Sequence, residues 1–359
     1  MSEYENLLRQ IKSQVPVDES FDLLERKLKI GERDATMFFV DGLVDGDVMQ
    51  RVVASLQGLD KKTVDRAKTA GEFMAYNLAF LDCLLASDMK QGIQFLYSGL
   101  IPLLIDGYDQ IIIIDGRDYP LRSVAEPSKE KSLRGAKDGF VEAMMMNIAL
   151  LRRRIRDNAL IFKIYAVGEV TKTDVALAYM KDRADQDMVK KMDQTLKQLR
   201  LRGLTVTEQT LVEALTGKKL SWCNPFPKVR YSQRPDIIAA HVEEGKLAVI
   251  VDNSPTVILL PAGIFDFLQD IDDYYFPLLT GNYFRFLRIL NIFVILFATP
   301  VYLLFAEGDI PVNEALRFFI TEEEFAISIF WQFILLELAV DGLKLASLNT
   351  PDSLGTRCR

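Results

Sequence analysis

The sequence predicts an α+β region, made of two α/β subdomains, that is followed by an α-helical transmembrane region. Up to Pro255, short β-branched or aromatic runs alternate with charged helical stretches. Beyond residue 280, the stretch 289–306 has no charged side chain. The chain of 359 residues is long enough for two or three domains.

These changes in composition divide the chain into five parts. We expect an N-terminal helical lead (1–30), a first cytosolic subdomain (31–160), a second (161–254), an interfacial linker (255–284) and a membrane region (285–359). The membrane region is expected to hold two transmembrane helices, at about 289–306 and 325–343, and to be incomplete.

Individual strands and helices follow from hydrophobic periodicity. The clearest strands are expected at 35–42, 100–107, 110–116, 174–180 and 247–253. Asp-Gly or Asp-Asn follows several of these strands, as is typical of turns. The segment "IDGYDQIIII" is expected to form a hairpin. Helices are expected at 45–57, 72–98, 139–158, 186–200, 208–216 and 233–244.

Composition argues against several classes of function. The net charge of −7 disfavours a chain that binds polyanions over its whole surface. Cys83, Cys223 and Cys358 lie too far apart for zinc or redox motifs, so reduced intracellular thiols are expected. His241 is the only histidine, and the acids are scattered. We therefore expect no catalytic residue, no cofactor and no metal site.

The two apolar stretches have the length of membrane spans. Residues 289–306 extend about 27 Å as a helix, close to the thickness of a bilayer core. Pro300 is expected to kink this helix, because proline removes one backbone hydrogen bond. The second stretch, 325–343, contains Glu337 and Asp341. A buried helix of a globular domain is the alternative for either stretch.

Two charged residues of the second stretch and Lys344, directly after it, fall on one helical face, because Asp341 follows Glu337 by four positions and Lys344 follows Asp341 by three. Such side chains are costly at membrane depth unless they face water or a partner. We therefore interpret Glu337, Asp341 and Lys344 as candidates for a pore lining or a subunit contact. The alternative is that Asp341 and Lys344 simply lie at the membrane interface.

The stretch 134–158, "RGAKDGFVEAMMMNIALLRRRIRDN", could be a phosphate-binding loop with a helix or a docked amphipathic helix. Gly135 and Gly139 belong to no recognised nucleotide-binding pattern. The apolar positions form one face: Phe140, Met144, Ile148, Leu151 and Ile155. The arginines fan around the remaining surface: Arg152, Arg153, Arg154 and Arg156. The docked helix is favoured, and no nucleic-acid partner is expected.

Four segments, in this order, resemble the GerA family. They are 116–156, 167–180, 234–275 and 284–293, and they include "RGAKDGFVEAMMMNIALLRRRIR" and "RPDIIAAHVEEGKLAVIVDNSPTVILLPAG". The family comprises A subunits of bacterial spore germinant receptors and their SpoVAF-type relatives. Family-motif positions with expected structural roles are Arg134, Gly135, Gly139, Phe140, Glu142, Asn147, Arg152, Arg154, Arg234, Pro235, Asp236, Asp252, Pro255 and Pro261.

The resemblance implies a role in spore germination. Such an A subunit is expected in the inner membrane of the endospore, as a homo-oligomer that forms a nutrient-gated channel for monovalent ions. Its expected partners are a transporter-like B subunit and a lipoprotein C subunit. The alternatives are a SpoVAF-type amplifier of ion release, or a truncated scaffold that does not conduct, because family members continue into further membrane spans.

The flanking charges predict which side of the membrane each part occupies. Arg285 and Arg288 precede the first apolar stretch, whereas the connection 307–324 is acidic. Because Lys and Arg favour the cytosolic side, residues 1–280 should lie inside and Glu322–Glu324 outside. A membrane-impermeant thiol reagent should therefore label a cysteine placed at position 322 and spare Cys83 and Cys223. The reverse labelling pattern would contradict this orientation.

Overall fold

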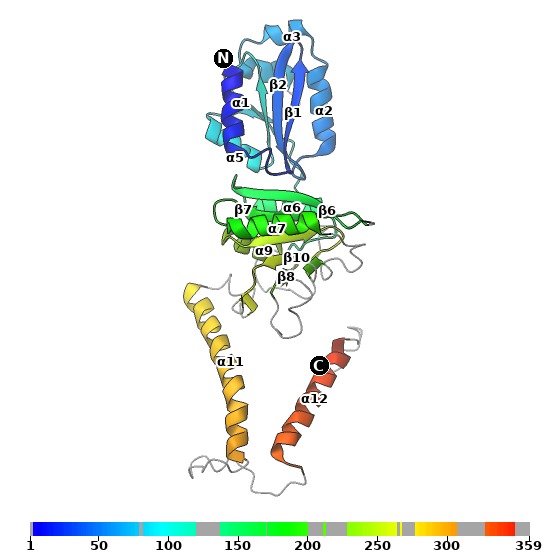
Figure 1. Ribbon diagram of the computed structural model, residues 1–359. Coiled ribbons are helices and arrows are strands. Elements are labelled where there is room, and N and C mark those ends of the chain that lie inside the picture. The colour runs from blue at the N-terminus through cyan, green and yellow to red at the C-terminus, as the bar shows by residue number, and fades with distance from the viewer. Residues whose placement is uncertain are drawn as a thin grey trace, which may run out of the picture. The chain divides into compact units, whose positions relative to one another are not determined.

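The computed structural model describes residues 3–78, 82–119, 137–169, 171–199, 211–212, 228–263, 266–267, 277–306 and 327–348 (Figure 1). The chain divides into two compact units, Met1–Tyr275 and Phe276–Arg359. The first unit contains two antiparallel sheets with their helices, and the second contains two long helices.

The first sheet has five strands in the order β1-β2-β4-β5-β3, and every neighbouring pair is antiparallel. The strands are β1 (Leu23–Ile30), β2 (Arg33–Val40), β3 (Cys83–Leu85), β4 (Ile101–Ile105) and β5 (Ile112–Ile114). One face packs against α2 (Gly46–Gln57), α3 (Lys61–Arg66) and α4 (Ala70–Asn77). The other face packs against α1 (Glu3–Gln14) and α5 (Met89–Tyr97), so helices cover both faces (Figure 1).

The second sheet repeats this architecture, with the order β6-β7-β9-β10-β8. Its strands are β6 (Leu160–Val167), β7 (Thr173–Met180), β8 (Arg230–Ser232), β9 (Leu247–Val251) and β10 (Val257–Leu260). Two helices, α6 (Met144–Arg154) and α9 (Pro235–Glu243), pack on one face. The opposite face packs against α7 (Gln186–Gln198).

The two halves match in strand order and in local detail. Each sheet opens with a hairpin of two eight-residue strands, β1–β2 or β6–β7. After each hairpin an aspartate caps the next helix, Asp45 for α2 and Asp185 for α7, and each carboxylate accepts two backbone N–H groups. Gly99 and Gly245 have positive φ at equivalent places, Gly99 between α5 and β4 and Gly245 between α9 and β9. The first unit therefore contains two copies of one architecture, and the sequence analysis did not predict this repeat.

Most of the expected strands and helices are present. The 100–107 and 110–116 stretches form the antiparallel pair β4–β5, and α2, α7 and α9 lie where helices were expected. The helix expected at 72–98 was wrong, because this stretch forms α4, β3 and α5. Residues 83–85 form a strand because they pair with β5. β5 lies further along the chain, so this pairing does not appear in the local hydrophobic pattern of 72–98.

Five strands were not expected: β1, β3, β6, β8 and β10. As a result, the N-terminal lead assigned to 1–30 contains β1, and the linker assigned to 255–284 begins inside the second sheet with β10. The helix expected at 139–158 is shorter, since α6 begins at Met144 and ends at Arg154. Most of the helix expected at 208–216 lies outside the described residues.

The second unit contains α11 (Leu278–Ala306) and α12 (Ile329–Leu348), which meet through the rings of Tyr302 and Phe333, 5.9 Å apart. Helix α11 continues through Pro300. Among the described residues, α11 alone is long and apolar enough to cross a membrane. Helix α12 carries three charged residues, so the second transmembrane helix stays a prediction.

Gly245 provides a test of the repeated turn. Its φ is +98°, and an added Cβ would lie 2.6 Å from the carbonyl oxygen of Arg183. Gly245→Ala should therefore lower the free energy of unfolding by about 3 kcal/mol, through strain and overpacking. Gly46→Ala is the matched control, because nothing lies within 4 Å of its added Cβ. Urea unfolding should show little change for Gly46→Ala, and equal losses would contradict the turn geometry.

Candidate functional site

The family-motif segments converge on the beginning of α6, although they lie far apart in the sequence. The N–H of Phe140 donates to the carbonyl oxygen of Gln233, at 2.8 Å. The N–H of Asn253 donates to the carbonyl oxygen of Glu142, also at 2.8 Å. These two bonds attach the approach to α6 to the start of α9 and to the β9–β10 turn.

Two side chains hold the beginning of α6. The amide of Asn147 accepts a hydrogen bond from the N–H of Val141 at 2.8 Å and donates to its carbonyl oxygen at 2.6 Å. The residue that precedes α6, Ala143, has no capping side chain, and the carboxylate of Asp252 accepts the N–H of Met144 at 3.2 Å instead. A carboxylate of the protein therefore occupies the place where the alternative interpretation put a phosphate.

Arg152 and Asp22 form a fully buried ion pair between the two sheets, with both side chains 0% exposed. Nε of Arg152 donates to Asp22 Oδ2 at 2.8 Å, and Nη2 donates to Oδ1 at 3.1 Å. The guanidinium also donates to the carbonyl oxygens of Asp157 and Leu160, at 3.1 and 3.0 Å. These hydrogen bonds and the opposite charges compensate for the removal of both side chains from water, as a buried ion pair requires.

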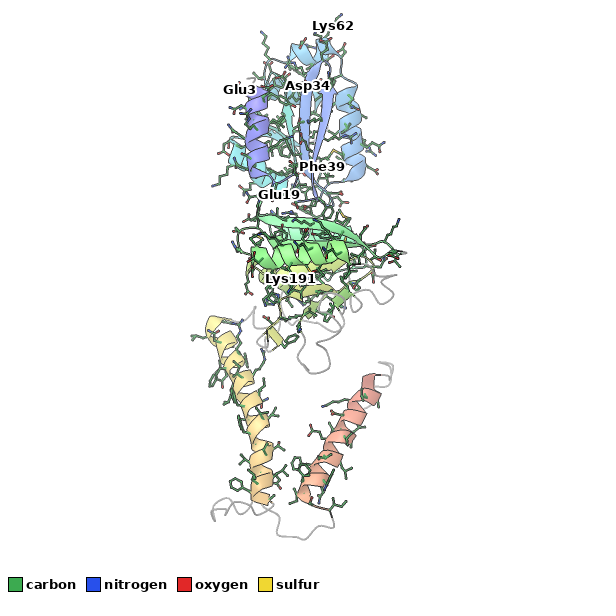
Figure 2. All side chains as sticks on the ribbon, viewed as in Figure 1. Glu3, Glu19, Asp34, Phe39, Lys62 and Lys191 are labelled. Atoms are coloured by element: carbon green, nitrogen blue, oxygen red, sulfur yellow. The ribbon has the colours of Figure 1, made fainter. Side chains whose placement is uncertain are left out.

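Ser20 extends this network to the edge of the second sheet. Its hydroxyl donates to Asp22 Oδ1 at 2.5 Å and accepts the N–H of Phe162 at 2.9 Å. The Arg152 guanidinium lies over the rings of Phe162 and Tyr97, at 5.0 and 5.5 Å. Burial raises the pKa of Tyr97 well above its usual range, so this ring stays neutral. Glu19 lies in the same junction (Figure 2), and its carboxylate forms an ion pair with Lys181 at 2.6 Å.

Helix α6 belongs to the cores of both halves. Ala149 packs with the first sheet, whereas Ile148 and Leu151 pack with the second. The close approach of α6 to the segment after β2 requires glycine at position 42, because an added Cβ would lie 3.0 Å from the Cβ of Ala149. The two sheets are therefore joined through one shared helix.

One of the four arginines does not lie on the surface as expected, whereas Arg153 and Arg154 are partly exposed and Arg156 is exposed. Arg152 is buried, which corrects that expectation, and the cause is its distant partner in the segment before β1. Arg154 pairs with Asp138 at 2.6 Å, and Arg153 lies over the ring of Tyr119 at 4.7 Å. The buried position of all five apolar residues, from Phe140 to Ile155, supports the docked helix. Arg134 and Gly135 lie outside the described residues.

Other motif positions lie in and next to α9. Arg234 is buried and contacts Asp236 through two bonds of 3.0 and 2.7 Å, and Pro235 begins α9. His241, in the last turn of α9, faces Arg230 and Glu244 at 3.1 Å each. Burial, then the positive charge of Lys246, lowers the pKa of His241, so the ring is neutral.

The remaining motif positions frame β10. Pro255 precedes this strand, and Pro261 follows it directly. Gly139 is buried in the approach to α6.

No cluster of three or more acidic, histidine or cysteine side chains suitable for a metal ion occurs among the described residues.

The predicted pore or contact residues all lie on α12. Lys344 and Asp341 form an ion pair at 3.1 Å, with 71% and 60% of their side chains exposed. Glu337 is exposed on the same helix. Phe333, Glu337, Asp341 and Lys344 follow one another at spacings of four, four and three residues, so they share one face. The face that contacts α11 through Phe333 is therefore the face that carries the charges.

The structure thus combines a repeated α/β region, held by a buried ion pair, with a helix suited to a membrane. A model of the Bacillus/Clostridium GerA spore germination protein matches residues 9–358. The chain therefore belongs to the GerA family of spore germination proteins, which is not a known class of enzymes.

Individual relatives agree with this assignment. Stage V sporulation protein AF of Bacillus subtilis (strain 168) is 32% identical over 345 residues, which cover 96% of this chain and 69% of that protein. Spore germination protein A1 of the same organism is 28% identical over 322 residues, which cover 89% and 64%. The chain therefore spans about two thirds of the length of these relatives.

The first unit also resembles a solved structure. The N-terminal domain of the A subunit of the Bacillus megaterium spore germinant receptor GerK3 superimposes with a TM-score of 0.54 at 26% sequence identity. The match covers 72% of this chain and 94% of that domain. The α/β architecture of the first unit is thus shared within the family.

The buried ion pair predicts a sharp stability difference. Asp22→Ala should lower the free energy of unfolding by about 3–5 kcal/mol, because it leaves the Arg152 cation buried without its partner. Replacing both residues, as Asp22→Leu with Arg152→Met, should recover most of that loss. The exposed pair Glu32–Lys61 is the control, and Glu32→Ala should change the free energy of unfolding little, because water screens this pair. Denaturant unfolding checks all three, and equal effects at both pairs would contradict the analysis.

Proposed function

We propose that this chain is a membrane subunit of a germinant receptor complex that oligomerises into a nutrient-gated channel for monovalent ions. Its place in the GerA family supports a role in spore germination. The channel, the homo-oligomer and the B-type and C-type partner subunits are the finer parts of the proposal. No catalytic step, cofactor or nucleic acid enters it.

One observation carries the channel proposal, namely the charged face of α12. An acid in a helix of this apolar character is unfavourable against lipid, and it is tolerated where it meets water or protein. Glu337 lies between Phe333, which contacts α11, and the Asp341–Lys344 pair. A bundle of such helices with this face inward would place Glu337 where cations pass or where subunits meet.

The membrane arrangement also belongs to this proposal. Helix α11 is suited to span the inner membrane of the endospore, with α12 as a second span. The first unit would then lie on the cytosolic side, as the flanking Arg285 and Arg288 suggest. The predicted interfacial segment after β10 would connect movements of the α/β region to α11.

A second function has specific support. The 32% identity to Stage V sporulation protein AF favours an amplifier of ion release that senses no nutrient of its own. Deletion of the candidate B and C subunits separates the two functions, since a receptor subunit would lose its nutrient response and an amplifier would still respond to other receptors. A scaffold that does not conduct is the third possibility, and it predicts normal ion release without this chain.

Glu337 provides the test of the charged face. Glu337→Gln should slow the release of monovalent ions from spores several-fold, while protein levels stay nearly normal. Glu337→Leu should be slower still, because leucine cannot form hydrogen bonds with water or a partner. The measurement is potassium efflux after addition of nutrient.

The matched control is Leu335→Gln, which places the same amide on the opposite face of α12. It should leave the efflux rate nearly unchanged. If spores with Glu337→Leu release ions at the normal rate, Glu337 faces lipid and has no role in conduction. In that case leucine should stabilise the protein, because it removes the cost of keeping a carboxylate away from water. That result would end the role of Glu337 without contradicting membership of the family.

A further inference from the structure

The segment that follows β10 is attached to the second sheet by an ion pair. The ammonium of Lys246, the residue before β9, donates to Asp266 Oδ1 at 2.5 Å. Both side chains are partly buried, with 20% and 14% of their surface exposed. Water screens a partly buried pair less than an exposed one, so this contact restrains its partners more than the exposed pair Lys190–Asp187 on α7.

Lys246 is anchored in a rigid part of the second sheet. It follows Gly245, whose positive φ forms the turn after α9, and its N–H donates to the carbonyl oxygen of His241 at 3.0 Å. It directly precedes β9, which lies between β7 and β10 in the sheet. Helix α9 packs with α6, the helix that both halves share. The backbone of Lys246 is therefore fixed to the sheet and to α9.

Asp266 is held in a compact turn with Gly263. Its N–H donates to the carbonyl oxygen of Gly263 at 3.1 Å, and its Oδ2 accepts the N–H of Gly263 at 2.7 Å. Just before this turn, the N–H of Ala262 donates to the carbonyl oxygen of Lys228 at 3.1 Å. Burial acts to raise the pKa of Asp266, but the hydrogen bonds from Lys246 and Gly263 outweigh it and lower that pKa. The carboxylate therefore stays ionised at neutral pH.

The first half has a different residue at the equivalent place. Leu100 and Lys246 each follow the positive-φ glycine of the repeat and precede the equivalent strands β4 and β9. Leu100 is 4% exposed and packs into the core of the first half. The architecture of the sheet therefore does not require a cation at this position. The cation occurs in the half from which the chain continues to α11, which begins at Leu278, shortly after Asp266.

We propose that the Lys246–Asp266 ion pair couples the second sheet to the segment that leads to α11, so that a movement of the sheet or of α9 is passed to that helix. This inference rests on the proposed ion channel and names a contact through which the α/β region would act on it. Without the pair, the segment could shift relative to β9 while the sheet stayed folded, because β9 and β10 are joined by their own backbone pairing. Lys246 and Asp266 are thus positioning residues, and neither needs to touch an ion.

Substitutions at the two positions test this coupling in the full chain, in spores. Lys246→Met keeps the apolar stem of the side chain, and Asp266→Asn keeps an oxygen that can accept the N–H of Gly263. Each should slow potassium efflux after addition of nutrient several-fold, while the amount of the protein in spore membranes stays nearly normal. Lys246→Arg keeps the positive charge and should release potassium at a nearly normal rate.

The double variant shows whether the two residues act as one unit. Lys246→Met combined with Asp266→Asn should be no slower than the slower single variant, because either change alone already removes the ion pair. The matched control is Lys190→Met, which removes the exposed pair with Asp187 in the same half. It should leave the efflux rate nearly unchanged.

Several results would overturn the inference. Normal efflux in both single variants, in spores whose efflux depends on the chain, ends the coupling role and leaves the proposed function standing. Losses that add up in the double variant mean that the two residues act separately, and losses that only follow the amount of protein mean that the pair only stabilises the fold. If deletion of the gene leaves efflux unchanged, the proposed function fails, and this inference fails with it.

Discussion

The first unit depends on a charge that cannot reach water. Arg152 and Asp22 are fully buried between the two sheets, and the free energy lost by removing water from them must be recovered by their mutual contact and by hydrogen bonds. That requirement fixes the segment before β1 against α6 and the start of β6. Because α6 packs into the cores of both halves, this contact contributes to the position of both sheets.

The two halves of the first unit share one architecture but differ in their surroundings. Both sheets have the same strand order, and matching aspartates, Asp45 and Asp185, cap the matching helices. The difference lies in what surrounds each sheet. The first has a charged edge at β1, whereas the second shares part of its edge at β6 with Ser20 and Phe21.

Much of the architecture was predictable from local pattern, and two of the missed strands share one cause. Buried strands such as β4 and β9 are continuous apolar runs, and Asp185 precedes α7 as a capping residue should. By contrast, β3 and β8 have three residues each, and their pairing partners lie elsewhere in the chain. Three residues carry no periodicity, so tertiary pairing alone makes them strands.

The sequence by itself determined the two classes of structure, because apolar periodicity and the uncharged run at 289–306 are local properties. It also located the charged positions of α12, since helical spacing is a sequence property. Only the tertiary structure decided the role of the motif residues. Arg152 reads as one arginine among four on a helix, and its burial depends on Asp22, a residue 130 positions away. Desolvation depends on all neighbours in space, and those neighbours are absent from the local pattern.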